Sequence, residues 1–155
     1  MSKPLQGYQH LRKGRVSIDH QIYLITTVTH QRSPVFAEYS RACAACRMFS
    51  SVLTQDHHTL LCWVLMPDHV HWLLQLGEDG DISKVVGKLK ATSAKAVRRL
   101  GFTGQVWAVG FHDHALRNDE DLLAVARYVV ANPLRAGLVR RISEYPYWDA
   151  VWINN

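Results

Sequence analysis

Residues 60–76 read LLCWVLMPDHVHWLLQL, and this stretch decides the fold. Residues 60–66 and 69–76 are rich in the apolar, β-branched and aromatic side chains that strands favour. Pro67 and Asp68 lie between the two runs, and both residue types are common in tight turns. The stretch therefore predicts two antiparallel strands joined as a β-hairpin.

Further elements are predicted on both sides of this hairpin. Residues 21–29 (QIYLITTVT) predict an earlier strand, and the apolar spacing of residues 38–55 predicts a first helix. Residues 82–100 predict a second helix, and residues 105–117 predict one or two short strands. A strand, a helix, the hairpin, a second helix and a further strand therefore follow one another along the chain.

A third helix is predicted after these strands. Asn118 suits its cap, and the three acidic residues that follow suit the positive end of a helix dipole. Pro133 ends this helix after Asn132, and residues 133–155 form a tail that packs on the domain. The whole order predicts a single α+β domain over residues 1–155, with an antiparallel, ferredoxin-like sheet and packed helices.

The charge of the chain indicates its class of partner. The 155 residues carry a formal net charge of +5, and the isoelectric point is about 9.3. A basic surface attracts polyanions, of which nucleic acid is the commonest. The apolar runs are far too short to cross a bilayer, so we expect a cytoplasmic protein with no membrane partner.

The three cysteines are predicted to be structural. Cys43 and Cys46 have C-x-x-C spacing but lie inside the first predicted helix, and Cys62 lies in a predicted strand. No second C-x-x-C pair exists to complete a tetrahedral zinc site. We therefore expect buried, reduced thiols that act as small apolar residues.

The hairpin also carries the first candidate site. On a strand, His69 and His71 leave the same face about 6.5–7 Å apart, while Val70 points the opposite way into the core. Two imidazoles on one face can converge on one metal ion, although H-x-H also arises by chance in a chain with nine histidines. A second copy, His112-Asp113-His114, is predicted to be structural or accessory.

The third predicted helix carries a second candidate pair. Tyr128 lies roughly 140° from the centre of the apolar stripe, so it does not fill the core beneath the helix. Asn132 follows one turn later, and its carbonyl oxygen suits a hard divalent ion. An exposed tyrosine on a helix without any such role is the plainer interpretation. The predicted stripe consists of Leu122, Leu123, Val125, Ala126, Val129 and Val130.

The second predicted helix contains no acidic residue from Ile82 to Leu100 but many basic ones. A stripe of one sign is a candidate track for phosphates, and a solvated helix face is the alternative. A basic N-terminal arm, residues 1–20, could extend the track. The predicted DNA-binding residues are Arg12, Arg15, Lys84, Lys88, Lys90, Lys95 and Arg98.

Together these motifs resemble the single-tyrosine HUH transposases, and most of all the REP-associated tyrosine transposases of bacteria. MPDHVHWLL is similar to the family's metal-binding strand, and ARYVVANPLRAGLV is similar to its catalytic helix and the turn that follows. THQRSPVF, WAVGFHDHALR and YPYWDA are also similar to stretches that the family shares. The insertion-sequence branch usually has glutamine where this chain has Asn132, which points to the REP-associated branch.

The resemblance implies an HUH endonuclease fold and a reaction. His69, His71 and Asn132 would hold Mg²⁺ or Mn²⁺, and Tyr128 would attack the DNA. A phenol with a pKa of ~10 is a weak nucleophile at neutral pH and needs activation. The resemblance further implies single-stranded DNA beside REP-type hairpins as substrate, a covalent 5′-phosphotyrosine, and a monomer rather than a homodimer.

Two other functions stay open at this point. A transposase-derived module could bind DNA hairpins sequence-specifically without cutting them. A metal-dependent hydrolase could use activated water, with Tyr128 in a structural role. A covalent adduct on Tyr128 separates the predicted enzyme from both alternatives.

Overall fold

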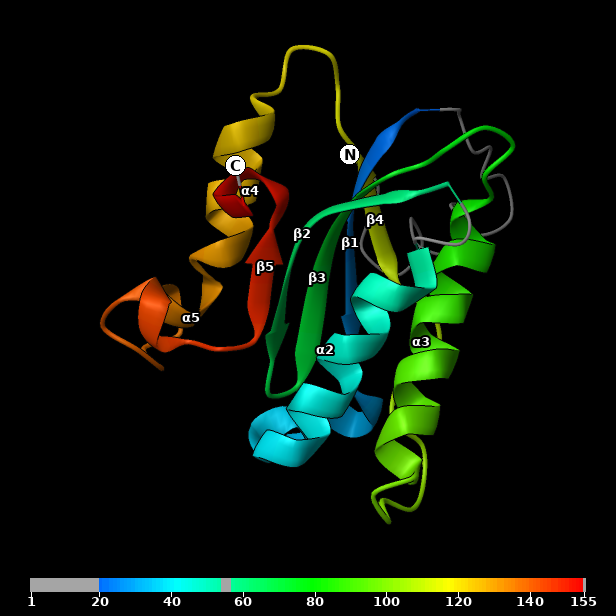
Figure 1. Ribbon diagram of the computed structural model, residues 1–155, viewed down its shortest axis with the longest axis vertical. Coiled ribbons are helices and arrows are strands. Elements are labelled where there is room, and N and C mark those ends of the chain that lie inside the picture. The colour runs from blue at the N-terminus through cyan, green and yellow to red at the C-terminus, as the bar shows by residue number, and fades with distance from the viewer. Residues whose placement is uncertain (1–19, 54–56, 155) are drawn as a thin grey trace.

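Alternation of apolar residues along the chain produces one antiparallel sheet in the computed structural model, which describes residues 20–53 and 57–154 (Figure 1). The strand order is β4–β1–β3–β2–β5. The predicted hairpin is confirmed, because β2 and β3 pair antiparallel with Met66 opposite His69. The strands of this sheet are β1 (Ile22–Val28), β2 (Thr59–Met66), β3 (His69–Gln75), β4 (His112–Ala115) and β5 (Trp148–Ala150).

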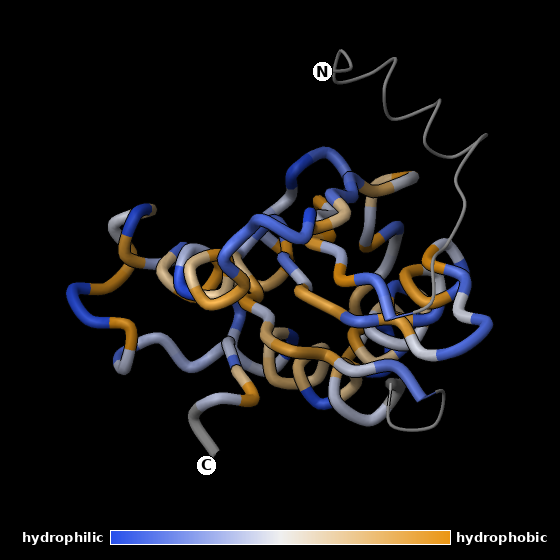
Figure 2. The backbone as a smooth tube through the Cα atoms, turned by 90° about the horizontal axis from the view of Figure 1, so that it is seen from above, coloured by the Kyte–Doolittle hydropathy of each residue, from blue (hydrophilic) through white to orange (hydrophobic). Residues whose placement is uncertain are grey.

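Helices cover both faces of the sheet. On one face lie α2 (Tyr39–Leu53) and α3 (Ile82–Arg98), and on the other lie α4 (Leu122–Val130) and the short α5 (Asn132–Arg135) (Figure 1). The hydrophobic segments lie mainly inside these layers, and hydrophilic segments form much of the outer loops (Figure 2). The predicted α+β class with helices packed on an antiparallel sheet is therefore confirmed.

The first core lies between the sheet and helices α2 and α3. Val70 and Trp72 of β3 are fully buried there, because alternate side chains of a strand point to the same face. Phe49 of α2 packs edge-on against Trp72, with ring centroids 5.4 Å apart. Val86 and Leu89 of α3 close the same core. This face is apolar and contributes no candidate ligand.

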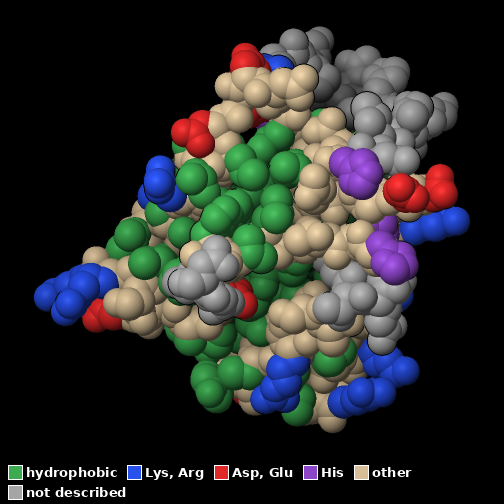
Figure 3. Space-filling view, turned by 45° about the horizontal axis from the view of Figure 1, so that its top comes forward, with side chains coloured by type: hydrophobic (Ala, Val, Ile, Leu, Met, Phe, Trp, Pro, Cys, Tyr) green, Lys and Arg blue, Asp and Glu red, His purple; other side chains and the backbone are tan. Residues whose placement is uncertain are grey.

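The second core lies under α4 and includes Leu73, Ala126 and Val129. The segment predicted as a tail also contributes here, since β5 pairs with β2 and the buried Tyr145 donates a hydrogen bond to the carbonyl of Leu65 at 2.5 Å. The space-filling view shows apolar side chains gathered in the middle of one side of the molecule, with lysines and arginines toward its edges (Figure 3).

The boundaries of the third predicted helix differ from the prediction. Asp121, rather than Asn118, caps α4, and its carboxylate accepts a hydrogen bond from the Ala124 N–H. The helix ends at Val130, and Pro133 lies in the first turn of a new helix, α5, where its missing N–H costs nothing. Leu123, predicted in the apolar stripe, is exposed.

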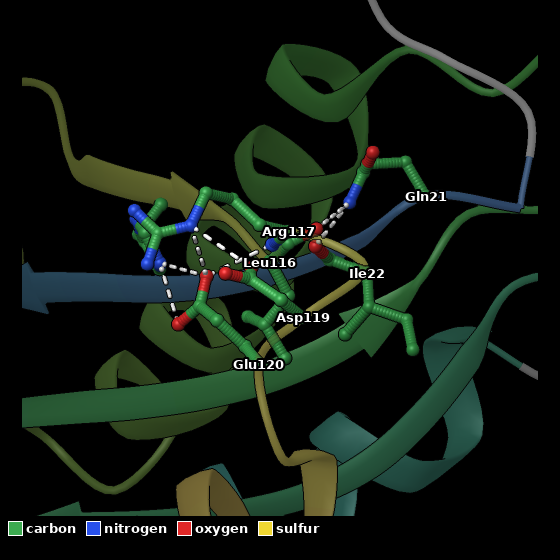
Figure 4. A network of polar contacts seen from close by, with 7 residues as sticks. Gln21, Ile22, Leu116, Arg117, Asp119 and Glu120 are labelled. Atoms are coloured by element: carbon green, nitrogen blue, oxygen red, sulfur yellow. Dashed lines mark hydrogen bonds and ion pairs between the residues drawn. The ribbon is translucent and has the colours of Figure 1, made fainter.

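A polar network explains the late start of α4. The Glu120 carboxylate accepts a hydrogen bond from the Arg117 N–H at 2.8 Å and lies 2.9 Å from Nε2 of His114. Gln21 donates to the carbonyl of Leu116 at 2.8 Å, which ties the connection to the start of β1 (Figure 4). Residues 116–120 are thus held as a loop that sets where α4 leaves the sheet.

The cysteines are free thiols, as predicted, but their burial is uneven. Cys62 is buried, whereas Cys43 and Cys46 are only half-buried on α2, which corrects the expectation for this pair. Burial raises the pKa of the Cys46 thiol to about 12, with Cys43 acting in the same direction. Within the part of the chain that the structure describes, no helix is long and apolar enough to cross a membrane.

Candidate active site

The two histidines of β3 share a face of the sheet, as predicted. Their ring centroids are 5.0 Å apart and the rings are nearly perpendicular. Thr26 of β1 and Val64 of β2 lie opposite His71, so the pair projects from the middle of the sheet. This is the face that carries α4, because Leu73, two residues further along β3, packs against that helix. The strand itself therefore brings two imidazoles together beneath the tyrosine-bearing helix.

A carboxylate holds the first histidine. His69 Nδ1 lies 2.8 Å from Asp68 Oδ1, and Arg32 Nε donates to Asp68 Oδ2 at 3.1 Å. Burial alone would raise the pKa of Asp68, but the hydrogen bond from His69 and the charge of Arg32 lower it. The ionised carboxylate fixes the His69 ring through Nδ1 and leaves Nε2 available to a ligand.

A hydroxyl holds the second histidine. His71 Nδ1 lies 2.7 Å from Thr26 Oγ1. The other ring nitrogen, Nε2, takes no part in this contact. Burial lowers the pKa of His71 to about 4, and the nearby charges of His69 and Arg135 act in the same direction. His71 is therefore neutral at physiological pH, the form in which imidazole binds a metal.

The tyrosine lies on the helix that packs against the histidine face of the sheet. Tyr128 is 60% exposed on α4, so it is not part of the core beneath that helix, as predicted. The guanidinium of Arg135, in α5, stacks on its ring, with Cζ 3.7 Å from the ring centroid. The charge of the same guanidinium acts on His71. Tyr128 and Arg135 therefore form a stacked pair on the side of the sheet that carries the histidines.

The donor set fits a hard divalent ion. Nε2 of both histidines is available, and Asn132, half-buried at the start of α5, lies one helical turn before Arg135. In residues 20–53 and 57–154, no three side chains of His, Cys, Asp or Glu gather as a metal site. A third protein ligand at this pair would thus be of another type, and an amide oxygen such as that of Asn132 is suitable.

The predicted DNA-binding residues do not all gather at this site. α3 packs on the opposite face of the sheet from His69 and His71, with Lys84, Lys88, Lys95 and Arg98 on its exposed side. Lys90 is half-buried, and its ammonium donates to the carbonyls of Ala108 and Gly110 at 2.8 and 2.9 Å. This lysine holds a loop, so the structure gives no support to its prediction as a DNA contact. Arg12 and Arg15 lie outside the described residues.

The second H-x-H copy lies on the same sheet face as the first. His112 pairs with Thr26 and His114 pairs with Leu24, and side chains paired across antiparallel strands leave the same face. His114 contacts Glu120 in the loop before α4. His114 thus supports that loop, which agrees with the structural or accessory role predicted for this copy.

Sequence reasoning missed four residues of this site: Thr26, Arg32, Asp68 and Arg135. Asp68 directly precedes the histidines, and Arg32 lies in THQRSPVF, so motif position could have drawn attention to both. Gln31 and Arg32 both have positive φ, at 56° and 55°, a backbone conformation that non-glycine residues adopt rarely. Thr26 could be found only from the pairing of β1 with β3.

Known proteins match this chain over most of its length. Residues 17–132 match the family model described as "Transposase IS200 like". A REP-associated tyrosine transposase of Escherichia coli K12 is 31% identical over 87 residues, which cover 55% of this chain and 50% of that protein. A putative REP-associated tyrosine transposase of Haemophilus influenzae is 29% identical over 94 residues, covering 54% and 53%. The chain spans about half the length of these relatives.

Solved structures share the fold. The structure of a REP-associated tyrosine transposase bound to a REP hairpin superposes with a TM-score of 0.69 and 23% identity, covering 96% of this chain and 82% of that one. A putative transposase from Deinococcus radiodurans R1 superposes with a TM-score of 0.57 and 19% identity, covering 93% and 97%. Both likenesses confirm the predicted fold class. Because the family model matches residues 17–132, this chain belongs to the IS200-like transposase family.

Proposed function

We propose that this chain cuts and rejoins single-stranded DNA beside REP-type hairpins through a covalent bond between Tyr128 and a 5′ phosphate. One observation supports the proposal most directly: His69 and His71 share a sheet face, each with Nδ1 engaged, and the Tyr128-bearing helix α4 packs on that same face. The named relatives and the hairpin-bound solved structure support the choice of substrate.

Each residue has a place in the proposed reaction. The Tyr128 oxygen attacks a backbone phosphorus, a new O–P bond forms, and the bond to the 3′ oxygen breaks. The leaving oxygen takes up a proton and becomes a free 3′-OH. Later, the 3′-OH of another strand attacks the phosphotyrosine, forms a new phosphodiester and restores the phenol. The ester bond is exchanged at each step, so no nucleotide cofactor is consumed.

Mg²⁺ or Mn²⁺ completes the proposal. His69, His71 and Asn132 would hold the ion, which supplies polarisation of the phosphate and charge stabilisation. The neutral state of His71 and the carboxylate behind His69 suit such binding. The Tyr128-bearing helix α4 packs on the histidine face of its own chain, which supports a monomeric active site.

Cleavage and binding can be tested separately. A labelled hairpin oligonucleotide with single-stranded flanks is incubated with the protein and Mn²⁺, and products are resolved under denaturing conditions. We expect a protein–DNA species with the wild type and none with Tyr128→Phe or His71→Ala, while both variants still bind the hairpin. Normal cleavage by Tyr128→Phe would contradict the proposed nucleophile. Binding without cleavage by the wild type would favour a hairpin-binding module instead.

A further inference from the structure

Arg135 uses only one part of its side chain in this structure. The face of its planar guanidinium stacks on the Tyr128 ring, with Cζ 3.7 Å from the ring centroid. The five N–H donors of a guanidinium point outward in its own plane, away from a stacked ring. Within residues 20–53 and 57–154, no hydrogen bond or ion pair engages these donors. A fork of donors is therefore held against Tyr128 with no acceptor among the described residues.

The position of this fork indicates the type of ligand. Arg135 lies against the candidate nucleophile and one helical turn after Asn132, the proposed third metal ligand. Its charge is not neutralised by any acidic side chain of the described residues. An arginine fork matches the oxygen geometry of a phosphate and binds it through two parallel hydrogen bonds. A phosphate oxygen beside Tyr128 is therefore the ligand that this fork of donors suits best.

We propose that Arg135 binds the non-bridging oxygens of the phosphodiester that Tyr128 attacks. This inference rests on the proposed function and assigns the group that recognises the reacting phosphate. Stacking keeps the phenol and the donor fork in one fixed relation, so a bound phosphate lies beside the attacking oxygen. Negative charge grows on the non-bridging oxygens during attack, and a preorganised cation stabilises it.

A neutral substitution tests the role of the charge. Single-turnover cleavage is measured at saturating protein with Mn²⁺, after the cleaved phosphate has been mapped with the wild type. Arg135→Gln should cleave about 100-fold more slowly, as expected for loss of one preorganised donor group. Hairpin affinity should stay within about threefold, because one contact among many is lost. The cleavage rate of Arg135→Lys should lie between those of the wild type and Arg135→Gln, since a lysine keeps the charge but not the planar fork of donors.

A neutral substrate separates phosphate binding from packing on the tyrosine. When a methylphosphonate replaces the cleaved phosphate, one charged oxygen is removed, and Arg135→Gln should then differ little from the wild type. An equal deficit on both substrates would show that Arg135 acts only by packing and would overturn the inference. Cleavage of the natural substrate by Arg135→Gln at the wild-type rate would also overturn the inference.

A matched variant controls for total charge. Arg140 is exposed in the same C-terminal segment, and among the described residues its one polar contact is a hydrogen bond from its backbone N–H to Glu144. Arg140→Gln removes the same charge and should cleave like the wild type. Tyr128→Phe is assayed in parallel, because cleavage by that variant would refute the proposed function itself. Loss of cleavage in Tyr128→Phe with normal cleavage in Arg135→Gln would refute only the role of Arg135.

Discussion

At the scale of single residues, the site depends on the groups behind the two histidines. Asp68 and Thr26 each engage an Nδ1 atom, so both rings are oriented before any ligand arrives. Partners of this type commonly change metal affinity or activity by 10- to 100-fold when they are lost. Metal binding should therefore be sensitive to residues that never touch the ion.

Thr26 offers a clean pair of substitutions. Thr26→Val keeps the shape of the side chain but removes the hydroxyl that contacts His71, whereas Thr26→Ser keeps the hydroxyl. We expect Thr26→Val to bind Mn²⁺ about tenfold or more weakly than the wild type, and Thr26→Ser to bind it nearly as well. Isothermal titration calorimetry with Mn²⁺ measures both. Equal affinities for the two variants would contradict the orienting role of Thr26.

His71 should also make the stability of the metal-free protein depend on pH. Its pKa is about 4 in the folded state and ~6.5 in an unfolded chain. Between these values the unfolded chain binds a proton that the folded chain does not, so the free energy of unfolding falls as pH falls. The loss between pH 7 and pH 5 is on the order of 2 kcal/mol.

The variant His71→Gln cannot take up that proton. Urea unfolding at both pH values, with EDTA present, should show a smaller loss of stability for His71→Gln than for the wild type, by about 2 kcal/mol. Other titrating groups act equally on both proteins and cancel in the comparison. An identical loss in the two proteins would mean that His71 titrates normally in the folded state.

At the scale of elements, α3 combines two kinds of lysine. Lys90 donates to the carbonyls of Ala108 and Gly110 and so holds the connection that leads into β4. Lys95 is exposed on the same helix. The sequence pattern placed both in one basic track, but only packing shows that their roles differ.

These two lysines can be compared with one substitution. Lys90→Gln should lower the free energy of unfolding by about 1–3 kcal/mol, because two partly buried carbonyls lose a charged donor. Lys95→Gln should change it by no more than about 0.5 kcal/mol, as is usual at an exposed position. Urea titration of both variants at neutral pH checks this. A Lys90→Gln variant as stable as Lys95→Gln would contradict the structural role of Lys90.

The existence of the main elements could be predicted, but some boundaries could not. Both hairpin strands are rich in apolar, β-branched and aromatic residues, and that local signal predicted β2 and β3 to within one residue. The start of α4 depends on Glu120, which is bonded to Arg117 and His114 in the folded loop. Pro133 stops one helix but also suits the first turn of another. Local sequence signals alone cannot choose between these outcomes.

The candidate site, too, could be predicted only in part from the sequence. Strand alternation alone placed His69 and His71 on one face, and helical periodicity alone kept Tyr128 out of the core. The contact of Thr26 joins segments far apart in the sequence, and that of Arg135 crosses the break between α4 and α5. They depend on strand pairing and on the turn between α4 and α5, which no local pattern encodes.

At the scale of the whole molecule, the two faces of the sheet have different roles. One face builds a large apolar core with α2 and α3, and the other presents the histidine pair beside α4 and α5. The exposed basic side chains of α3 lie on the far side of the sheet from that pair. A contact between α3 and DNA would therefore involve a part of the substrate other than the reacting phosphate.

The site of covalent attachment tests the central claim most directly. Trypsin cleaves after Arg127 and Arg135, so Tyr128 lies in the peptide YVVANPLR, which contains no other tyrosine. The denatured protein–DNA species is digested with nuclease and trypsin and analysed by mass spectrometry. The account predicts a nucleotide phosphate on Tyr128 in this peptide. DNA cleavage with no such adduct, or an adduct on a different residue, would contradict it.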